Sequence, residues 1–202
     1  MYSLSLRKNL ALKLSLSFVF IYIILAILSR KAFSISIKYL LILGQVNYFI
    51  LKNGYFWQLF TSIFIHVNIL HLAFNTFFMY IIGTSVENKI GPKDMFLVFL
   101  SSGLIGNVFS LLGGTRYPIT AGASGGILGL AAFDIIFVKI ISGGSLMPAI
   151  STLVVLFLMN SFLPGVDILG HLGGIIGGAV IGFVYGKYKV RRIIKYRITL
   201  DY

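Results

Sequence analysis

The sequence predicts an all-α, multi-pass membrane protein, and three observations lead to this fold class. The chain of 202 residues is 58% hydrophobic and only 11% charged, with a mean hydropathy of +0.97. A soluble domain of this size would leave much of that apolar surface in water, whereas lipid covers the outside of a membrane bundle. Apolar stretches of about 20 residues, the length that crosses a bilayer, recur along the chain between charged residues, Gly and Pro.

Six stretches have the length and composition of a membrane-spanning helix: 10–29, 66–86, 95–113, 120–139, 147–163 and 168–186. The fifth is the shortest and has Pro148 near its start. The first follows Arg7 and Lys8, as a secretory signal would, but no small-residue cleavage site comes after it. We therefore expect a retained first helix in a six-helix bundle.

The net charge of +12 would suit nucleic-acid binding, but the position of the basic residues does not. The largest basic cluster directly follows the last predicted span and consists of Lys187, Lys189, Arg191, Arg192, Lys195 and Arg197. Such residues typically flank a membrane helix on its cytoplasmic side, where anionic lipid head groups attract them. We expect the lipid bilayer, and not nucleic acid, to be the partner of this tail.

The distribution of basic residues also predicts the orientation. With a cytoplasmic N-terminus, six spans return the C-terminus to the same side, and 12 of the 17 Lys and Arg residues then lie inside. The positive-inside rule favours this arrangement. We expect a single domain over 1–202 in a prokaryotic cell membrane, with a core at about 10–186 and a basic cytoplasmic tail at 187–202.

The stretch 32–65 is too long for a tight connection and too hydrophobic for a solvated loop. Apolar residues alternate with polar or small ones from Phe33 to Leu43, and an aromatic cluster follows at Tyr55, Phe56 and Trp57. These features predict a structured loop that lies partly in the bilayer interface. The alternative is a seventh span, although Lys38 and Lys52 bracket only a short apolar run.

Four polar residues within or at the start of the predicted spans are candidates for function, because such groups cost free energy in lipid. His71 and Asn75 are four residues apart and share one helix face. Ser124 lies near the start of the fourth span and His171 near the start of the sixth. The second, fourth and sixth spans all run from outside to inside, so we expect all four side chains at similar depth in the outer half of the membrane.

Glycines on the fourth and sixth spans predict close packing of these two helices. Gly122, Gly125 and Gly129 face a similar four-residue pattern of Gly174, Gly178 and Gly182. Small residues at this spacing let helix backbones approach each other, although such patterns are common in membrane proteins of many functions. Close approach is what a hydrogen bond between Ser124 and His171 requires.

The chemistry of these residue types indicates acyl transfer. His171 can take the proton of the Ser124 hydroxyl and return it to a leaving amine. His71, Asn75 and the Ser124 backbone N–H can donate hydrogen bonds to the oxyanion that forms. A third, acidic member is not expected, since Asp134 lies about 15 Å below Ser124 at helical rise and Asp167 is better placed to cap a helix. We expect His66 to be structural and Asp134 and Lys139 to pair or to snorkel.

From about Gly44 to Gly186 the motifs resemble those of the rhomboid family. They comprise Tyr55-Phe-Trp-Gln-Leu-Phe-Thr-Ser62, His66, His71-Leu-Ala-Phe-Asn75, Gly83, Glu87 and Gly91, Gly122-Ala-Ser-Gly125, Asp167, and His171-Leu-Gly-Gly-Ile-Ile-Gly-Gly178. Gly-x-Ser-Gly alone is a weak signal. Its position on the fourth span, between His-x-x-x-Asn on the second and His-x-x-Gly-x-x-x-Gly on the sixth, is a strong one.

The resemblance implies an intramembrane serine endopeptidase that cuts transmembrane segments of other proteins near their outer end, with no metal and no cofactor. It implies Ser124 as the nucleophile, His171 as general base and acid, and His71 and Asn75 as oxyanion stabilisers. It also implies that the fifth helix and the loop at 164–166 move to admit substrate. The sequence specifies no oligomeric state.

Two positions depart from the family pattern. Rhomboids often have Trp-Arg in the first loop, whereas this chain has Trp57-Gln58, so an ion pair made there is absent. Many members have an aromatic residue four positions after the serine that stacks on the catalytic histidine, and here that residue is Leu128. We expect His171 to keep an apolar wall at Leu128 but to lose its aromatic partner.

Two other functions remain open from sequence. One is a rhomboid-like pseudoprotease, which binds membrane clients without cutting them, although such proteins usually lack the serine or the histidine. The other is a small transporter or channel, whose polar residues would bind solute. No internal repeat or pair of broken helices supports transport in this sequence.

Overall fold

The computed structural model describes residues 9–114, 119–143 and 167–200, together with Met147, Ile150, Ser151, Leu153, Val154 and Phe157; of 193–200 it describes the backbone only. Among these described residues, five helices are long and apolar enough to cross a membrane: α1 (Leu10–Ser29), α5 (Ile69–Ile90), α6 (Pro92–Leu112), α7 (Ser124–Ser142) and α9 (Ile168–Leu200). The prediction of an all-α, multi-pass membrane fold is confirmed. Most of the predicted span at 147–163 lies outside the described residues.

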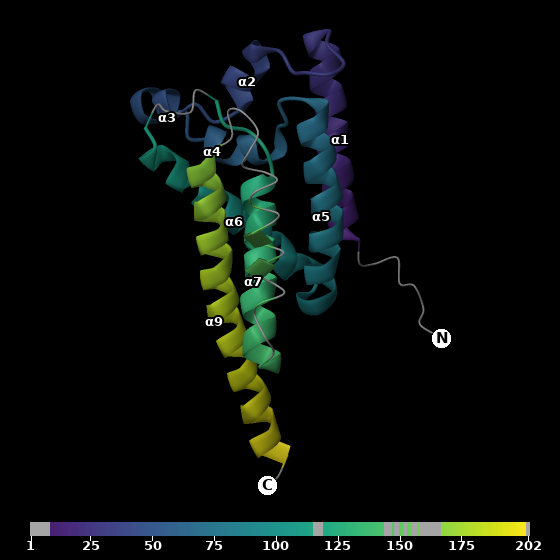
Figure 1. Cartoon of the computed structure of the whole chain (residues 1–202), viewed down its shortest axis with the longest axis vertical. Coiled ribbons are helices and arrows are strands. Elements are labelled where there is room, and N and C mark those ends of the chain that lie inside the picture. Colours follow the sequence, from purple (N-terminus) through teal and green to yellow (C-terminus); the bar gives the residue numbers. More distant parts are fainter. Residues whose placement is uncertain are drawn as a thin grey trace, which may run out of the picture.

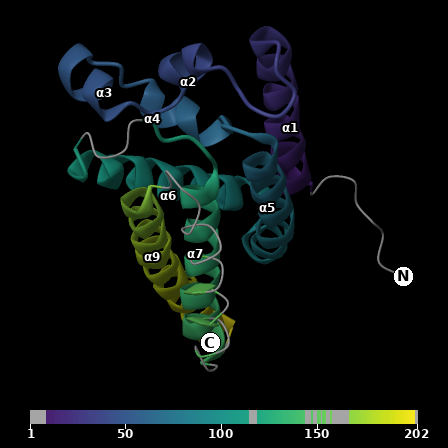
Figure 2. The same cartoon turned by 45° about the horizontal axis from the view of Figure 1, so that its top comes forward.

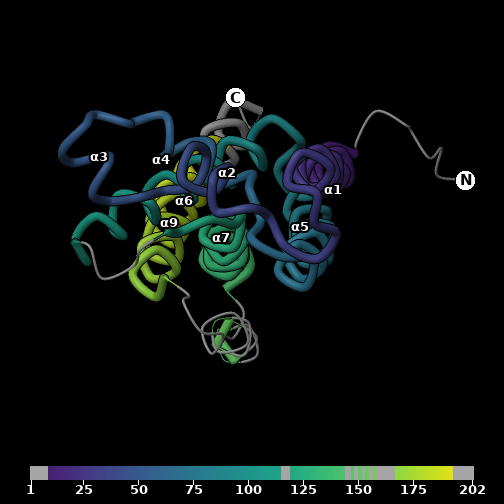
Figure 3. The backbone as a smooth tube through the Cα atoms, turned by 90° about the horizontal axis from the view of Figure 1, so that it is seen from above, coloured from purple at the N-terminus to yellow at the C-terminus, as the bar shows by residue number. Residues whose placement is uncertain are grey.

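The long helices run in two directions. In Figure 1, α5, α7 and α9 all begin at the upper end and descend, whereas α1 and α6 rise toward that end. Figure 2 shows that α6 runs across α7 and α9 instead of alongside them, and it contacts both. Seen from above in Figure 3, α7 lies between α5 and α9, and it contacts α5, α6 and α9. Because α7 is enclosed in this way, it is the most buried of the five spans.

Several helix boundaries differ from the predicted ones. The second span was predicted from residue 66, but α5 begins at Ile69, because Asn68 caps it by accepting the backbone N–H of His71 at 2.8 Å. The third was predicted from 95, but α6 begins at Pro92, since proline suits the first position of a helix. The last helix continues well past the predicted end at 186, so the basic tail is helical as far as Leu200.

The start of α7 is the correction that matters most for the site. The fourth span was predicted from residue 120, but α7 begins at Ser124. Thr120 forms an isolated β-bridge with Gln45 of the first loop, with N–H···O distances of 2.8 and 2.7 Å. Gly122 has φ +138° and donates its N–H to the Ser62 carbonyl at 2.9 Å. The chain therefore enters α7 as an extended segment that is hydrogen-bonded to the first loop.

The first loop, residues 32–65, is structured, as predicted, and it consists of short helices that were not predicted. It contains α2 (Ile37–Leu43), α3 (Asn47–Asn53), α4 (Gln58–Thr61) and the 3₁₀ turn η1 (Ser62–Phe64). None of these elements is long enough to span a bilayer, so the alternative of a seventh span here is wrong. Large apolar side chains are exposed on the loop: Phe33, Ile37, Ile42, Tyr48, Leu51, Phe56, Trp57 and Phe60. The loop lies at the end of the bundle where α5, α7 and α9 begin (Figure 1).

A buried polar network holds this loop against α6. The Gln58 side chain is fully buried; its Oε1 accepts the Val46 N–H at 2.9 Å and its Nε2 donates to the Leu41 carbonyl at 2.7 Å. Asn47 Nδ2 donates to the Ser110 carbonyl at 2.8 Å, and Asn107 Nδ2 donates to the Leu59 carbonyl at 2.6 Å. Gln58 thus orders the loop through hydrogen bonds to the backbone of Leu41 and Val46.

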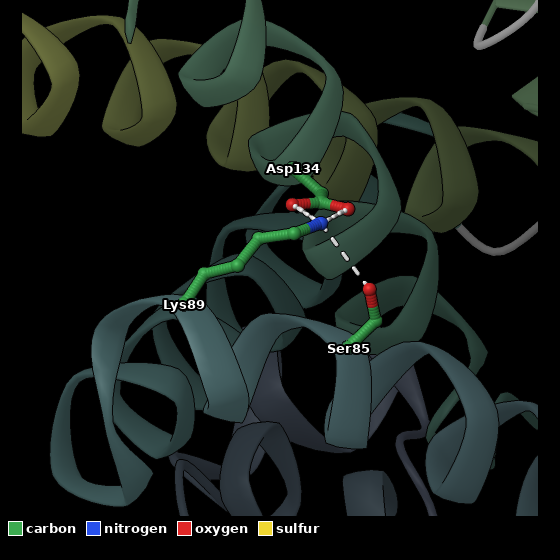
Figure 4. A network of polar contacts seen from close by, with 3 residues as sticks. All are labelled: Ser85, Lys89 and Asp134. Atoms are coloured by element: carbon green, nitrogen blue, oxygen red, sulfur yellow. Dashed lines mark hydrogen bonds and ion pairs between the residues drawn. The ribbon is translucent and has the colours of Figure 1, made fainter.

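Polar contacts of Glu87 and Lys89 fasten the opposite end of the bundle. The buried Glu87 carboxylate of α5 accepts the N–H groups of Leu10 and Ala11 at 3.1 and 2.8 Å, so it caps α1. Lys89 Nζ lies 2.5 Å from Asp134 Oδ2 and also donates to Ser85 Oγ at 3.2 Å (Figure 4). Asp134 therefore pairs with Lys89 of α5 and joins α5 to α7.

Candidate active site

Two side chains of the predicted site are joined by a short hydrogen bond. Ser124 is the first residue of α7 and His171 lies in the first turns of α9. The Ser124 Oγ and His171 Nε2 atoms are 2.7 Å apart, and the two residues are 8% and 6% exposed. A serine hydroxyl within hydrogen-bond reach of an imidazole nitrogen is the arrangement that activates a nucleophile by general-base catalysis.

Glycine makes this approach possible, because α7 and α9 touch backbone to backbone. A Cβ atom on Gly174 would collide with the Gly125 carbonyl, and one on Gly178 would collide with the Gly129 carbonyl. Further along, a Cβ on Gly182 would lie 2.7 Å from the Phe133 carbonyl. The two helices are thus closer than any larger residue at these positions would permit.

Gly122 was expected inside the fourth span, but it lies outside that helix. It precedes α7, and a Cβ atom on it would lie 2.5 Å from Cε1 of the His71 ring. Its positive φ is a conformation that residues with a side chain rarely adopt. Gly122 therefore lets the chain that leads into Ser124 pass directly against His71.

Asn75 lies one helical turn beyond His71 on α5. Its Nδ2 donates to the His71 carbonyl at 2.9 Å, which fixes the orientation of the amide, since a carbonyl can only accept. Asn75 is 1% exposed, and its Oδ1 has no hydrogen-bond partner among the residues that the structure describes. Among the described residues, no hydrogen bond joins the Asn75 side chain to Ser124.

His66 is buried beside His71. The two imidazole rings meet nearly at right angles with centroids 5.4 Å apart, and the Phe18 ring lies 5.3 Å from His66 on another side. Burial lowers the pKa of His66 to about 3, so the ring is neutral near pH 7. A neutral ring packed between Phe18 and His71 fits the structural role expected for His66.

Asp167 caps α9, as its position in the sequence suggested. Its Oδ1 accepts the Gly170 N–H at 2.9 Å and its backbone carbonyl accepts the His171 N–H at 3.1 Å. Its Oδ2 accepts the Thr120 hydroxyl at 3.2 Å. Both carboxylate oxygens are therefore engaged by groups other than the His171 ring.

The surroundings of His171 differ from the expectation in one respect. The aromatic partner was expected to be lost because Leu128 occupies the usual position. The Phe157 ring instead lies 6.3 Å from the His171 ring, centroid to centroid, at an interplanar angle of 73°. Leu128 is buried in the same apolar cluster as Phe157. Phe157 was not predicted as a neighbour of His171, because an aromatic residue in an apolar span carries no sign of which side chain it contacts.

Thr120 and Asn68 were also missed, and both leave signals in the sequence. Asn68 stands three residues before His71, which is the spacing of a capping side chain to the N–H that it accepts. Thr120 had been placed inside a helix, so its hydroxyl was not considered as a partner for a residue of α9. Its contact with Asp167 joins residues 47 positions apart, which local patterns do not reveal.

The fold and the site together define a multi-pass helical membrane protein with a buried Ser–His pair at the end of the bundle that carries the first loop. Comparison with known families agrees with this class. The family model for the rhomboid domain matches residues 53–188, which is well over half of the chain. The chain therefore belongs to the rhomboid family.

Individual relatives are similar over about 70% of the chain. The chain is 31% identical to the rhomboid protease GluP of Bacillus subtilis over 145 residues and 31% identical to YdcA of the same organism, also named as a rhomboid, over 144 residues. It is 29% identical to the rhomboid protease AarA of Providencia stuartii over 173 residues. These matches cover 69%, 69% and 72% of this chain, but 28%, 72% and 62% of the respective relatives.

Proposed function

We propose that this protein is an intramembrane serine endopeptidase that cleaves transmembrane segments of other membrane proteins near their outer face. The observation that carries the proposal is the 2.7 Å contact between Ser124 Oγ and His171 Nε2 inside a membrane-spanning bundle. The names of the relatives, which describe rhomboid proteases, support the same activity. The proposal needs no metal and no cofactor, since both proton transfers involve protein side chains.

In the proposed acylation step, Ser124 Oγ attacks the carbonyl carbon of the scissile peptide bond. The hydroxyl proton moves to His171 Nε2, and the carbonyl oxygen becomes an oxyanion. When the tetrahedral intermediate collapses, the C–N bond breaks and His171 gives its proton to the leaving nitrogen. Water, again deprotonated by His171, then releases the acyl group from Ser124. The scheme assigns the Asp167 carboxylate no part in proton transfer, and this carboxylate accepts hydrogen bonds from Gly170 and Thr120.

The oxyanion would be stabilised by the Ser124 backbone N–H and by the side chains of His71 and Asn75. Ser124 is the first residue of α7, so its N–H belongs to the group of helix-initial donors without an intrahelical acceptor. The contact of Gly122 with the His71 ring supports a position of His71 beside the nucleophile. Asn75 Nδ2 has a second N–H bond besides the one directed at the His71 carbonyl, which leaves a donor for substrate.

The membrane context restricts the substrate class. An intact transmembrane helix uses its carbonyl oxygens in internal hydrogen bonds, so a residue that weakens the helix near the cleavage site should favour attack. Ser124 and His171 lie near the ends of α7 and α9 where those helices begin. With both termini cytoplasmic, as the basic residues indicate, this end faces outward, where water for deacylation is available.

Reconstitution tests the proposal directly. The purified protein is placed in liposomes with a type I membrane substrate that carries a fluorophore on each side of its transmembrane segment. Cleavage should disappear in Ser124→Ala and His171→Ala, and Asn75→Ala should retain activity lowered by about 10²- to 10³-fold at most. Ser17→Ala is the matched control, since Ser17 lies on α1 and bonds its own-helix Leu14 carbonyl. Equal cleavage by Ser124→Ala and the unaltered protein would exclude a serine protease.

The same liposomes separate the other two functions. A pseudoprotease would bind the substrate, detected by energy transfer between labels on the two proteins, without producing fragments. A transporter would carry solute across the liposome membrane at a rate that Ser124→Ala does not change. The intact Ser–His contact favours the protease over both.

A further inference from the structure

Asp167 occupies an unusual position between the two chain segments that carry the Ser–His pair. Its Oδ2 accepts the hydroxyl of Thr120, which is four residues before Ser124. Its backbone carbonyl accepts the N–H of His171, which is four residues after Asp167 itself. One residue therefore contacts both the segment that leads into the nucleophile and the backbone of the base.

The geometry around Asp167 leaves its side chain little freedom. Asp167 is 5% exposed, and its Oδ1 is directed into the first turn of α9 by the Gly170 N–H at 2.9 Å. A Cβ atom on Gly170 would lie 2.9 Å from Oδ2, so the carboxylate packs directly over that residue. The N-terminus of α9 stabilises the negative charge, which strengthens the capping hydrogen bond.

Apart from its contact with Asp167, the segment 120–123 is held by hydrogen bonds to the first loop. Thr120 bonds Gln45 through its backbone N–H and carbonyl, and the Gly122 N–H bonds the Ser62 carbonyl. These bonds fix the segment 120–123 to the first loop. Within the described part of the chain, the hydrogen bond from the Thr120 hydroxyl to Asp167 joins this segment to the start of α9.

We propose that Asp167, through its hydrogen bond to Thr120, is a positioning residue that holds the start of α9 in register with the start of α7 and so keeps His171 Nε2 within bonding distance of Ser124 Oγ. This inference rests on the proposed function. The glycine contacts set how closely α7 and α9 approach along their length. The Thr120–Asp167 bond acts at the end of the helices, where the reacting atoms lie and where a displacement of about 1 Å is costly for reactivity.

The test compares conservative variants in liposomes. Thr120→Val keeps the shape of the side chain and the cap but removes the hydroxyl. Asp167→Ala removes the bond and the cap, whereas Asp167→Asn keeps acceptors and donors for both Gly170 and Thr120. Thr84→Val makes the matched change on α5. The measurements are kcat and KM for cleavage, and the rate at which a fluorophosphonate probe labels Ser124 without any substrate.

We expect Thr120→Val to lower kcat and the labelling rate by roughly 3- to 10-fold with KM unchanged, the size of one lost hydrogen bond. Asp167→Ala should lose at least as much, Asp167→Asn should stay within about 2-fold of the unaltered protein, and Thr84→Val should match it. In the Asp167→Ala background, Thr120→Val should have no further effect, because the two residues act through one bond.

Other results would overturn the inference. If Thr120→Val retained full kcat, or if its effect added in full to that of Asp167→Ala, the bond would not position the pair. A rise in KM with unchanged labelling would assign Asp167 to substrate binding instead. Failure of the proposed function is a separate result: Ser124→Ala would then cleave as well as the unaltered protein, whatever the Thr120 and Asp167 variants do.

Discussion

The ring of Phe157 meets the ring of His171 at an interplanar angle of 73°, with centroids 6.3 Å apart. This separation and angle are typical of edge-to-face aromatic contacts. Phe157 packs in one apolar cluster with Leu128 and Ala131 of α7 and with Ile175, one turn beyond His171 on α9. The Phe157 ring therefore restricts rotation of the imidazole on the side where the two rings meet.

Removal of this contact should slow the reaction without abolishing it. We expect Phe157→Ala to lower kcat by roughly 2- to 10-fold, because an aromatic pair of this kind contributes about 0.5–1.5 kcal/mol to holding the ring. Phe157→Tyr should retain most of the activity. The measurement is cleavage in liposomes, with Phe183→Ala as control, since Phe183 is exposed on the outer surface of α9.

A second-site change sharpens this test. In the Phe157→Ala background the cluster has room beside Leu128, so Leu128→Phe supplies an aromatic ring from α7 instead. Partial recovery of kcat in the double variant would show that His171 needs an aromatic neighbour and not Phe157 itself. No loss of kcat in Phe157→Ala would show that the ring contact has no part in the reaction.

The helices could largely be predicted from sequence because membrane spans are long, continuous and apolar. The bounds of α1 coincide with the predicted 10–29. Errors arose at helix starts, where a single cap decides the boundary: Asn68 delays α5, and the bonds of Thr120 and Gly122 to the first loop delay α7. Those bonds join distant segments, so hydropathy in a local window does not contain them.

The glycine contacts between α7 and α9 give a stability and activity prediction. Gly174→Ala should separate the helices and lower the labelling rate of Ser124 by more than about tenfold, because the new Cβ meets the rigid Gly125 carbonyl. Val180→Ala is the matched control on the same helix, since the Val180 side chain is exposed. Equal labelling by the two variants would argue against helix separation as the cause.

The Glu87 carboxylate gives a prediction at the opposite end of the bundle. Glu87→Ala leaves the N–H groups of Leu10 and Ala11 without their acceptor, so it should lower the free energy of unfolding by about 1–3 kcal/mol. Glu87→Gln keeps one acceptor oxygen and should lose less. Thermal unfolding in detergent micelles measures both, with the exposed neighbour Asn88→Ala as control. A Glu87→Ala melting curve that matched the control would mean that solvent replaces the cap at no cost.

The site was more predictable in its residues than in its geometry. Ser124, His171, His71 and Asn75 stand out because polar groups in apolar spans are costly, and matching helix directions bring them to one end of the bundle. The polar residues of the first loop could not be recognised in this way, because they lie outside the apolar spans. Gln45, Asn47 and Gln58 look like ordinary loop residues, yet all three are buried and hydrogen-bonded. Burial outside a span depends on the tertiary fold.

His66 gives a prediction about acid sensitivity. Its pKa is lowered from near 6.5 to about 3 in the folded protein, since burial disfavours the charged ring. Between these two values the unfolded chain binds a proton that the folded chain does not, so the free energy of unfolding falls as the pH falls through this range and is unaffected above it. His66→Phe removes this titration. We expect the stability lost between about pH 7 and pH 4.5 to be roughly 2–3 kcal/mol smaller in His66→Phe than in the unaltered protein. Chemical unfolding in micelles at each pH measures the difference, and parallel losses in both proteins would mean that His66 is accessible to protons in the folded state.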